Sequence, residues 1–187
     1  MKYNKTVILK DNVECLLRNA TGADAEQVYE NFILTHGQTD FLLSYPDENS
    51  FGVEEERTFL TEKENSDNEI EICAIINGRV VGTAGLESIG KKDKIKHRAE
   101  FGVSIEKDYW GKGIGRALTE ACIECAKNAG YAQLELWVVG ENTKAIALYE
   151  SVGFREFGRN PRGFRSRLTG WQDLVLMGME LPDKNSF

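Results

Sequence analysis

Proline is scarce in this chain, with three residues, Pro46, Pro161 and Pro182, among 187. The sequence has no internal repeat, no low-complexity tract and no linker between two domains. No apolar run approaches the length that spans a membrane, and the N-terminal segment lacks the apolar core and cleavage site of a signal peptide. These absences favour one soluble domain over residues 1–187, located in the cytoplasm.

Residues that bind metals are few as well, because the chain has two histidines, His36 and His97, and four cysteines. Cys122 and Cys125 form a CxxC pair, but a zinc site needs a second such pair or nearby histidines. The two cysteines also lie on the apolar side of a predicted helix. We therefore expect both to be small core residues, and we expect no metal site.

Basic charge is in the minority, with 23 Lys and Arg against 30 Asp and Glu and a net charge of −7. This balance argues against a protein that binds nucleic acid. Acids concentrate in residues 54–71, whereas bases concentrate in residues 91–98 and 155–167. We interpret the two basic clusters as solvated loops in preference to binding patches.

Hydrophobic periodicity predicts alternating strands and helices in a mixed α+β fold. The predicted strands cover residues 13–19, 69–76, 79–88, 98–105, 133–139, 154–160 and 173–181. The predicted helices cover residues 25–34, 54–63, 142–151 and a segment that ends at Gly130. Asn77 and Gly78 form a strong two-residue hairpin signal, and an arginine-rich connection is expected between the last two strands.

The stretch DYWGKGIGRALTEACIECAKNAG places three glycines, Gly111, Gly113 and Gly115, directly before a helix. The first turn of a helix has unpaired backbone N–H groups and the positive end of the helix dipole. Glycines let a ligand approach that backbone closely, and Lys112 and Arg116 add positive charge. The pattern predicts a phosphate site at the start of the helix, since a tight turn alone needs one or two glycines.

Two common phosphate-binding motifs do not fit this stretch. The Walker pattern GxxxxGK[ST] is absent, and the dinucleotide pattern GxGxxG fails at its last spacing. A nucleotide-binding protein with another phosphate ligand is therefore disfavoured.

WGKGIGRAL resembles the pyrophosphate-binding motif R/Q-x-x-G-x-G/A of the GNAT superfamily of N-acetyltransferases, with Trp110 in place of the Arg or Gln. Two further segments are similar to family motifs: 99–105 to the central strand, and 142–154 to a short helix with a tyrosine followed by Gly-Phe. The resemblance implies a central mixed, mostly antiparallel twisted sheet of about six to seven strands flanked by about four helices. The N–H donors of the loop come from the backbone, so we expect the site to tolerate Trp110, which mainly shapes the loop.

The resemblance also implies acetyl-CoA as co-substrate. The loop residues would wrap the pyrophosphate, the central strand would pair with the pantetheine arm, and two residues of the later helix would contact the cofactor near its distal end. In this order, the implied contacts are Gly111, Lys112, Gly113, Ile114, Gly115 and Arg116; Val103, Ser104 and Ile105; and Asn142 and Lys144.

Attack of a neutral amine on a thioester needs a base for the amine proton and an acid for the leaving thiolate. By resemblance Tyr149 is the acid, with core packing as its alternative role. Glu100 faces away from the large apolar residues of its strand and is a candidate base, with a plain surface role as its alternative. His97 is a weaker candidate base.

The acceptor pocket is expected from residues 32–51 and from the hairpin 155–171, whose aromatic side chains are candidates for its lining: Phe41, Tyr45, Phe164 and Trp171. The acids of residues 54–56 would attract a cationic amine or form a solvated helix face. A small amine and a protein amine both remain open as acceptor, as does a homodimer. A non-catalytic acyl-CoA-binding module is the alternative function, and no nucleic acid or membrane partner is expected.

Overall fold

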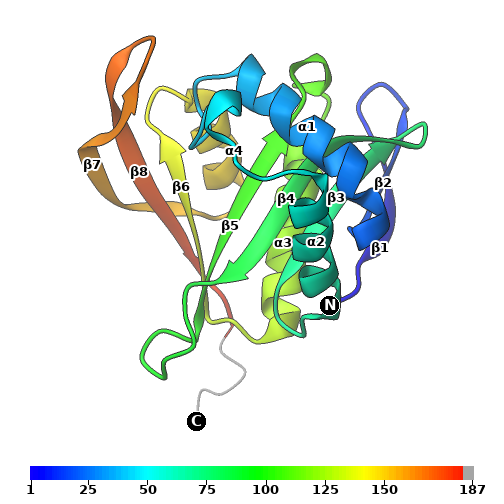
Figure 1. The fold of residues 1–187 in the computed structure, drawn as a ribbon. Helices are drawn as coiled ribbons and strands as arrows, with labels where there is room; N and C mark the ends of the chain where they lie inside the picture. The colour runs from blue at the N-terminus through cyan, green and yellow to red at the C-terminus, as the bar shows by residue number, and fades with distance from the viewer. Residues whose placement is uncertain (183–187) are drawn as a thin grey trace.

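The computed structural model describes residues 1–182 and builds them around one eight-stranded sheet (Figure 1). The strand order is β1-β2-β3-β4-β5-β6-β8-β7. The strands are β1 (Asn4–Ile8), β2 (Glu14–Asn19), β3 (Ile70–Ile76), β4 (Arg79–Ser88), β5 (Arg98–Ile105), β6 (Gln133–Val139), β7 (Arg155–Ser166) and β8 (Gly170–Glu180). Residues 183–187, which the single-domain prediction includes, lie outside the described residues.

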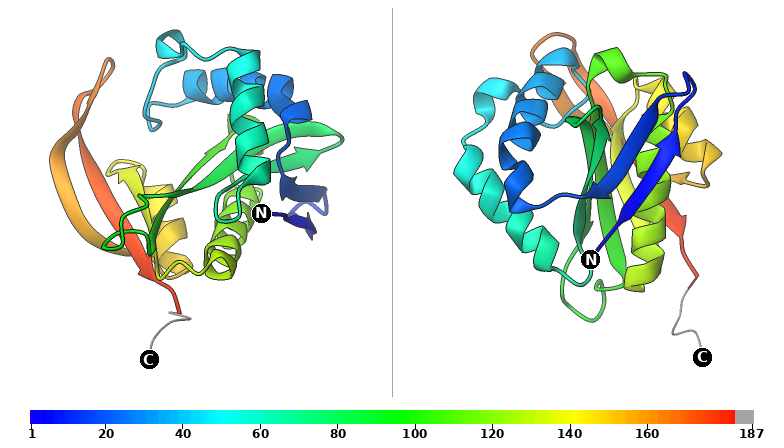
Figure 2. Two further views of the ribbon diagram at one scale, coloured as in Figure 1. Left: turned by 60° about the horizontal axis from the view of Figure 1, so that its bottom comes forward. Right: turned by 90° about the vertical axis from the view of Figure 1, so that its right-hand side faces the viewer.

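Four α-helices cover the two faces of the sheet (Figure 2). They are α1 (Ala25–Gln38), α2 (Val53–Asn65), α3 (Ile114–Ala129) and α4 (Thr143–Ser151). Helices α1 and α2 pack on one face through a small cluster that includes Val28, Leu60 and Cys73. Helix α3 packs on the other face, where the main core contains Leu86 and Leu118. The mixed α+β prediction is confirmed.

All neighbouring strands are antiparallel except β5 and β6, which are parallel and joined by α3. Only three register pairs join β5 to β6, from Arg98↔Gln133 to Glu100↔Glu135. In contrast, β4 pairs with β5 as far as Ile105, and β8 pairs with β6 as far as Val139. The sheet therefore splits between β5 and β6 beyond Glu100.

The sheet has one strand more than the upper predicted number, because β1 was not predicted from its sequence. Its sequence NKTVI is mostly polar, and four of its five residues are exposed. A strand at the edge of a sheet buries little apolar surface, so its hydrophobic alternation is weak.

The arginine-rich connection between the last two strands is shorter than expected, because β7 and β8 extend through most of it. Pairing is irregular between Asn160 and Phe164, on either side of Pro161, and then resumes with Phe164↔Gln172 and Arg165↔Trp171. Proline lacks the N–H that a regular ladder needs, and an irregularity on an edge strand tolerates it.

Two local predictions are confirmed. Asn77 and Gly78 both have positive φ, +51° and +78°, as a type I′ hairpin turn requires. Cys122 and Cys125 are free thiols buried in the core along α3.

Candidate active site

The split leaves one edge of β5 without a strand partner. From Phe101 to Ile105 this strand pairs with β4 on one side only, because its pairing with β6 ends at Glu100. Unpaired backbone groups at such an edge can bind an extended ligand that carries amide groups. The predicted contacts Val103, Ser104 and Ile105 lie in this part of β5, where the Ile105 carbonyl already accepts a bond from the Trp110 indole.

The glycine loop reaches the same end of β5. Gly111 and Gly113 have φ of +78° and +105°, and a Cβ on either would meet no atom within 4 Å. Glycine is favoured at these positions because of the positive φ, and not because a side chain would clash with its surroundings. At Gly115 a Cβ would lie 3.3 Å from Leu148 Cδ2 and 3.4 Å from Ile105 Cδ1. The third glycine thus allows α3 to pack closely on α4 and β5.

The start of α3 offers backbone donors beside the split. The backbone N–H of Ala117 donates to Gly113 O at 3.1 Å. The N–H groups of Ile114, Gly115 and Arg116 precede this first helical bond, at the positive end of the helix dipole. The indole N–H of Trp110 donates to Ile105 O at 2.7 Å and ties the loop to β5. Trp110 therefore shapes the loop, as expected.

The two basic side chains of the loop already make contacts within the protein. Arg116 donates to Ser151 Oγ at 2.7 Å, at the end of α4. The Lys112 ammonium lies 5.1 Å from the centroid of the Tyr109 ring. In this arrangement Arg116 offers the site its backbone N–H, whereas its guanidinium joins α3 to α4.

The predicted contacts on α4 differ from each other in their surroundings. The side chain of Asn142 caps the helix by accepting a hydrogen bond from the backbone N–H of Ala145 at 3.4 Å. Lys144 is exposed in the first turn. Of these two predicted contacts, only Lys144 carries a charge, and it faces solvent.

Tyr149 lies near the end of α4 and packs on the face of β5 that α3 covers. It is 7% exposed. Its ring is edge-on to Phe101, with centroids 5.8 Å apart and planes at 90°, and it also contacts Phe154. Burial, and to a lesser extent the thiol of Cys122, raises the pKa of the Tyr149 hydroxyl. The hydroxyl is therefore protonated at neutral pH, although its raised pKa makes it a weaker acid than an exposed tyrosine.

Glu100 lies on the opposite face of β5, in a lateral row of three carboxylates. Register places it beside Glu87 of β4 and Glu135 of β6. Glu135 binds Arg98 through two hydrogen bonds, and Glu87 pairs with Lys63 at 3.0 Å. Among residues 1–182 no cation pairs with Glu100. Burial, followed by the charges of Glu135 and Glu87, raises the pKa of Glu100.

A second carboxylate, Glu71, lies on the same face and was not recognised from the sequence. Register aligns Glu71 with Gly85, and Gly85 with Gly102. A Cβ on Gly85 would come within 2.6 Å of Glu71 Oε2, whereas a Cβ on Gly102 would meet nothing within 4 Å. The Glu71 carboxyl thus lies across Gly85, beside open space over Gly102. Burial, with the charges of Glu56 and Glu87, raises the pKa of Glu71 to about 8.

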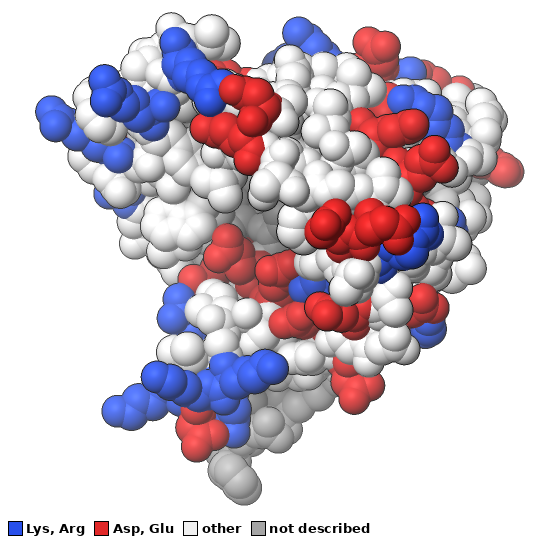
Figure 3. Space-filling model, viewed as in Figure 1, with Lys and Arg blue, Asp and Glu red and all other residues white. Residues whose placement is uncertain are grey.

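This sheet face is the floor of a hollow between α1–α2 and the β7–β8 hairpin (Figure 3). Acidic side chains gather at the hollow, whereas the two basic clusters lie at the hairpin and at the loop before β5. On the hairpin side, Trp137 is 46% exposed, and the Phe157 ring lies where a Cβ on Gly178 would be. The hollow thus has an acidic side and an aromatic side.

The remaining predicted side chains differ in position: Phe41 and Phe164 are half-buried, and strand alternation places Trp171 on the face of β8 opposite Gln172, away from the hollow. Trp171 is exposed between Arg162 and Arg165, each 5.3 Å from its ring centroid. Tyr45 contacts the β7–β8 hairpin through its hydroxyl. His97 is exposed in the loop before β5, and its charge helps to lower the pKa of Glu135.

Within the described part of the chain, no three His, Cys, Asp or Glu residues are grouped to hold a metal ion. None of the helices in residues 1–182 has the length and apolar character needed to cross a bilayer.

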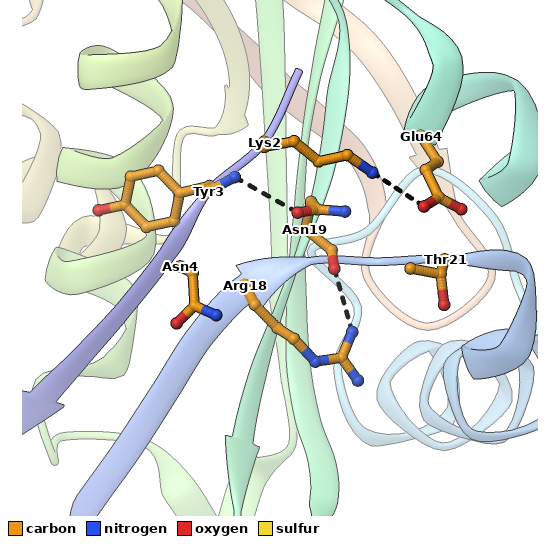
Figure 4. A pocket seen from close by; sticks show the side chains of 7 residues that line it. All are labelled: Lys2, Tyr3, Asn4, Arg18, Asn19, Thr21 and Glu64. Atoms are coloured by element: carbon orange, nitrogen blue, oxygen red, sulfur yellow. Dashed lines mark hydrogen bonds and ion pairs between the residues drawn. The ribbon is translucent and has the colours of Figure 1, made fainter.

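A separate surface pocket lies at the N-terminus, beside β1 and β2 (Figure 4). Its charged groups are paired: Lys2 with Glu64 at 2.8 Å, and Arg18 with Asp24 at 2.7 Å. Strands β3 and β4 separate it from β5, so it is not part of the site at the split.

Comparison with known proteins agrees with this geometry. Residues 38–154, more than half of the chain, match the model of the acetyltransferase (GNAT) family. An acetyltransferase of the GNAT family from Streptococcus pneumoniae superposes with a TM-score of 0.85 and 30% identity, over 89% of this chain and 99% of that one. A putative acetyltransferase from Salmonella typhimurium, solved with its cofactor acetyl-CoA, has a TM-score of 0.79 and 22% identity, over 91% and 96% of the two chains.

Among curated proteins, the [ribosomal protein bS18]-alanine N-acetyltransferase of Escherichia coli K12 is 37% identical over 81 residues. The match covers 43% of this chain and 54% of that protein, so the chain spans about half the length of this curated relative. The family model covers the split, the glycine loop and α4 together. The chain belongs to the GNAT family of acetyltransferases.

Proposed function

We propose that this chain, acting as one catalytic domain, transfers the acetyl group of acetyl-CoA to a primary amine. The observation that carries the proposal is the split between β5 and β6, which opens beside the N-terminus of α3. The split supplies a free strand edge for an amide-bearing arm, and the helix supplies N–H donors for phosphate. The relative from Salmonella, which was solved with acetyl-CoA, supports the same choice of ligand.

Positive φ at Gly111 and Gly113 lets the chain turn tightly before α3, and the N-terminal N–H groups of α3 fit a pyrophosphate. The N–H groups from Ile114 to Arg116 would bind the phosphates. Residues 103–105 would pair with the pantetheine arm, and Lys144 would lie near a phosphate. Lys112 and Asn142 would contribute mainly by holding the loop and α4 in place.

Replacing Gly113 by alanine is expected to weaken acetyl-CoA binding at least tenfold. Alanine is strained at φ +105°, so the loop must change conformation or the folded state loses about 1–2 kcal/mol. Gly130→Ala is the matched control, because Gly130 ends the same helix at φ +84° in open space. Calorimetric titration should show weaker acetyl-CoA binding for Gly113→Ala and not for Gly130→Ala. The free energy of unfolding should fall by a similar amount in both variants. Equal affinities would contradict a role of the loop in binding.

The proposed chemistry uses both faces of β5. The neutral amine attacks the thioester carbon, Glu100 takes the proton that the amine loses, and Tyr149 gives a proton to the leaving sulfur. Phe101, next to Glu100 in the chain, contacts Tyr149 on the other face, so the two groups flank the split. Glu71 is a second candidate base, because its pKa lies near the pH at which such a group works best.

The acceptor would enter the hollow over Gly102. Its acidic side favours a cationic amine, and its aromatic side suits the apolar part of such a molecule. A small amine and the N-terminal or lysine amine of a protein both fit this description, and the name of the Escherichia coli relative specifies a ribosomal protein. Cytoplasmic location and a homodimer remain parts of the proposal.

The test is CoA release from acetyl-CoA across a panel of polyamines, aminoglycosides, amino acids and short peptides with free N-termini. Saturable turnover with one class would support the proposal and identify the acceptor type. Tight acetyl-CoA binding without turnover on any amine would favour the alternative, an acyl-CoA-binding module without catalytic activity.

A further inference from the structure

A hydrogen-bonded bridge joins the α1–α2 connection (residues 39–52) to the turn of the β7–β8 hairpin. At its centre Asp40 Oδ2 accepts hydrogen bonds from Ser166 Oγ at 2.5 Å, Thr169 Oγ1 at 3.3 Å and Gln172 Nε2 at 3.3 Å. Asp40 Oδ1 accepts a bond from the Tyr45 hydroxyl at 2.9 Å. One carboxylate therefore holds three side chains of the hairpin and one of its own segment.

A second set of contacts lies beside the first. The backbone N–H of Arg167 donates to the Tyr45 hydroxyl at 2.8 Å, and its guanidinium donates to Asp47 at 2.7 Å and Glu48 at 3.2 Å. The guanidinium also lies 4.2 Å from the centroid of the Tyr45 ring. These groups are exposed, and exposed ion pairs contribute little to stability.

The bonds of Asp40 are better shielded. Ser166 and Gln172 are 8% and 4% exposed, so their polar atoms depend on protein partners. Hydrogen bonds to a charged group are stronger than neutral ones, and they cost more when one partner is removed. Asp40 is therefore the main attachment between the two segments.

The bridge connects the two walls of the hollow above the acidic floor. Helices α1 and α2 form one wall, and the β7–β8 hairpin forms the other (Figures 1 and 3). A two-stranded hairpin at the end of a sheet fluctuates unless it is packed or tied. When the walls are ordered before binding, the acceptor loses less free energy in ordering them.

We propose that Asp40 is a positioning residue for the acceptor, which fixes the spacing between the helical wall and the hairpin wall. The proposal rests on the acetyl transfer proposed above. Asp40 would affect how tightly the acceptor binds, without contacting the reacting atoms.

Asp40→Ala is expected to raise the KM for the amine about tenfold, equivalent to about 1.4 kcal/mol. The affinity for acetyl-CoA and kcat should stay within about twofold, because the split and α3 are unchanged. Asp40→Asn keeps one oxygen that can accept from the hairpin donors, so a smaller rise in KM is expected. Asp173→Ala is the control, because it removes an exposed carboxylate whose partner Arg159 belongs to the same hairpin.

Hydrogen exchange without any substrate provides a readout that does not depend on turnover. Backbone amides of residues 39–48 and 166–172 should exchange faster in Asp40→Ala than in the parent or in Asp173→Ala. Faster exchange together with an absence of turnover in every variant would support the bridge and contradict the proposed function. Unchanged exchange together with an unchanged KM for the amine would overturn the role of Asp40. A rise in the KM for the amine that is matched by an equal rise in the Kd for acetyl-CoA would also overturn it. If Asp40→Ala does not fold, the same comparisons apply to Asp40→Asn.

Discussion

Tyr149→Phe is expected to lower kcat by about 10²-fold or more, the usual contribution of a positioned acid, and to leave the affinity for acetyl-CoA within twofold. Phenylalanine keeps the edge-on contact with Phe101 and the contact with Phe154. It removes only the hydroxyl, so the leaving thiolate would depart without its proton. Steady-state CoA release and direct acetyl-CoA titration measure the two quantities separately.

Tyr131→Phe is the matched control for that variant. Tyr131 is 3% exposed, follows the end of α3 and accepts a hydrogen bond from Asn68 at 2.8 Å. Losing this hydroxyl should cost some stability without slowing turnover. Burial raises the pKa of Tyr149 above its usual value of 10.0. Its hydroxyl should therefore stay protonated, and the parent enzyme should keep its activity, up to about pH 10. Equal losses of kcat and acetyl-CoA affinity in Tyr149→Phe would show a purely structural role.

Glu100→Gln is expected to lower kcat/KM by about 10²-fold at neutral pH and to remove the acidic limb of the pH–rate profile. A base works only when it is deprotonated, so the rate of the parent should rise with pH through the pKa of Glu100. Burial and two neighbouring carboxylates raise that pKa above 4.5. Glu87→Gln removes one of those charges and should shift the limb to lower pH.

Glu71→Gln separates the two candidate bases. Its carboxyl has a pKa of about 8, so a limb near pH 8 that disappears in Glu71→Gln would assign the base to Glu71. A limb at lower pH that disappears only in Glu100→Gln would assign it to Glu100. Loss of neither limb would show that neither carboxylate is the base.

The sequence was most informative where local chemistry demands a particular residue. Positive φ at Asn77 and Gly78 follows from the hairpin signal, and the glycines before α3 occupy conformations that other residues avoid. The parallel pair β5–β6 follows from a strand, a helix and a strand in succession. These features depend on neighbours in the chain, so they can be read without a tertiary structure.

The features that were missed depend on partners that are distant in sequence. Glu71 approaches the site because β3, β4 and β5 pair in a particular register, and one shift of register would turn it away. Asp40 gains its role from a hairpin more than 100 residues later in the chain. Strand β1 has too few apolar residues for its pattern to stand out, and β7 continues past Pro161 only because β8 pairs with it again.

The two outer strands of the sheet also affect how copies of the protein associate. Strand β7 is interrupted at two register irregularities, contains Pro161 and carries four arginines, Arg155, Arg159, Arg162 and Arg165. At the opposite edge, β1 is five residues long and contains a lysine. Short, charged or bulged edges resist pairing with strands of another molecule. Both outer edges of the sheet thus disfavour edge-to-edge pairing between copies of the protein, the contact from which β-aggregates grow.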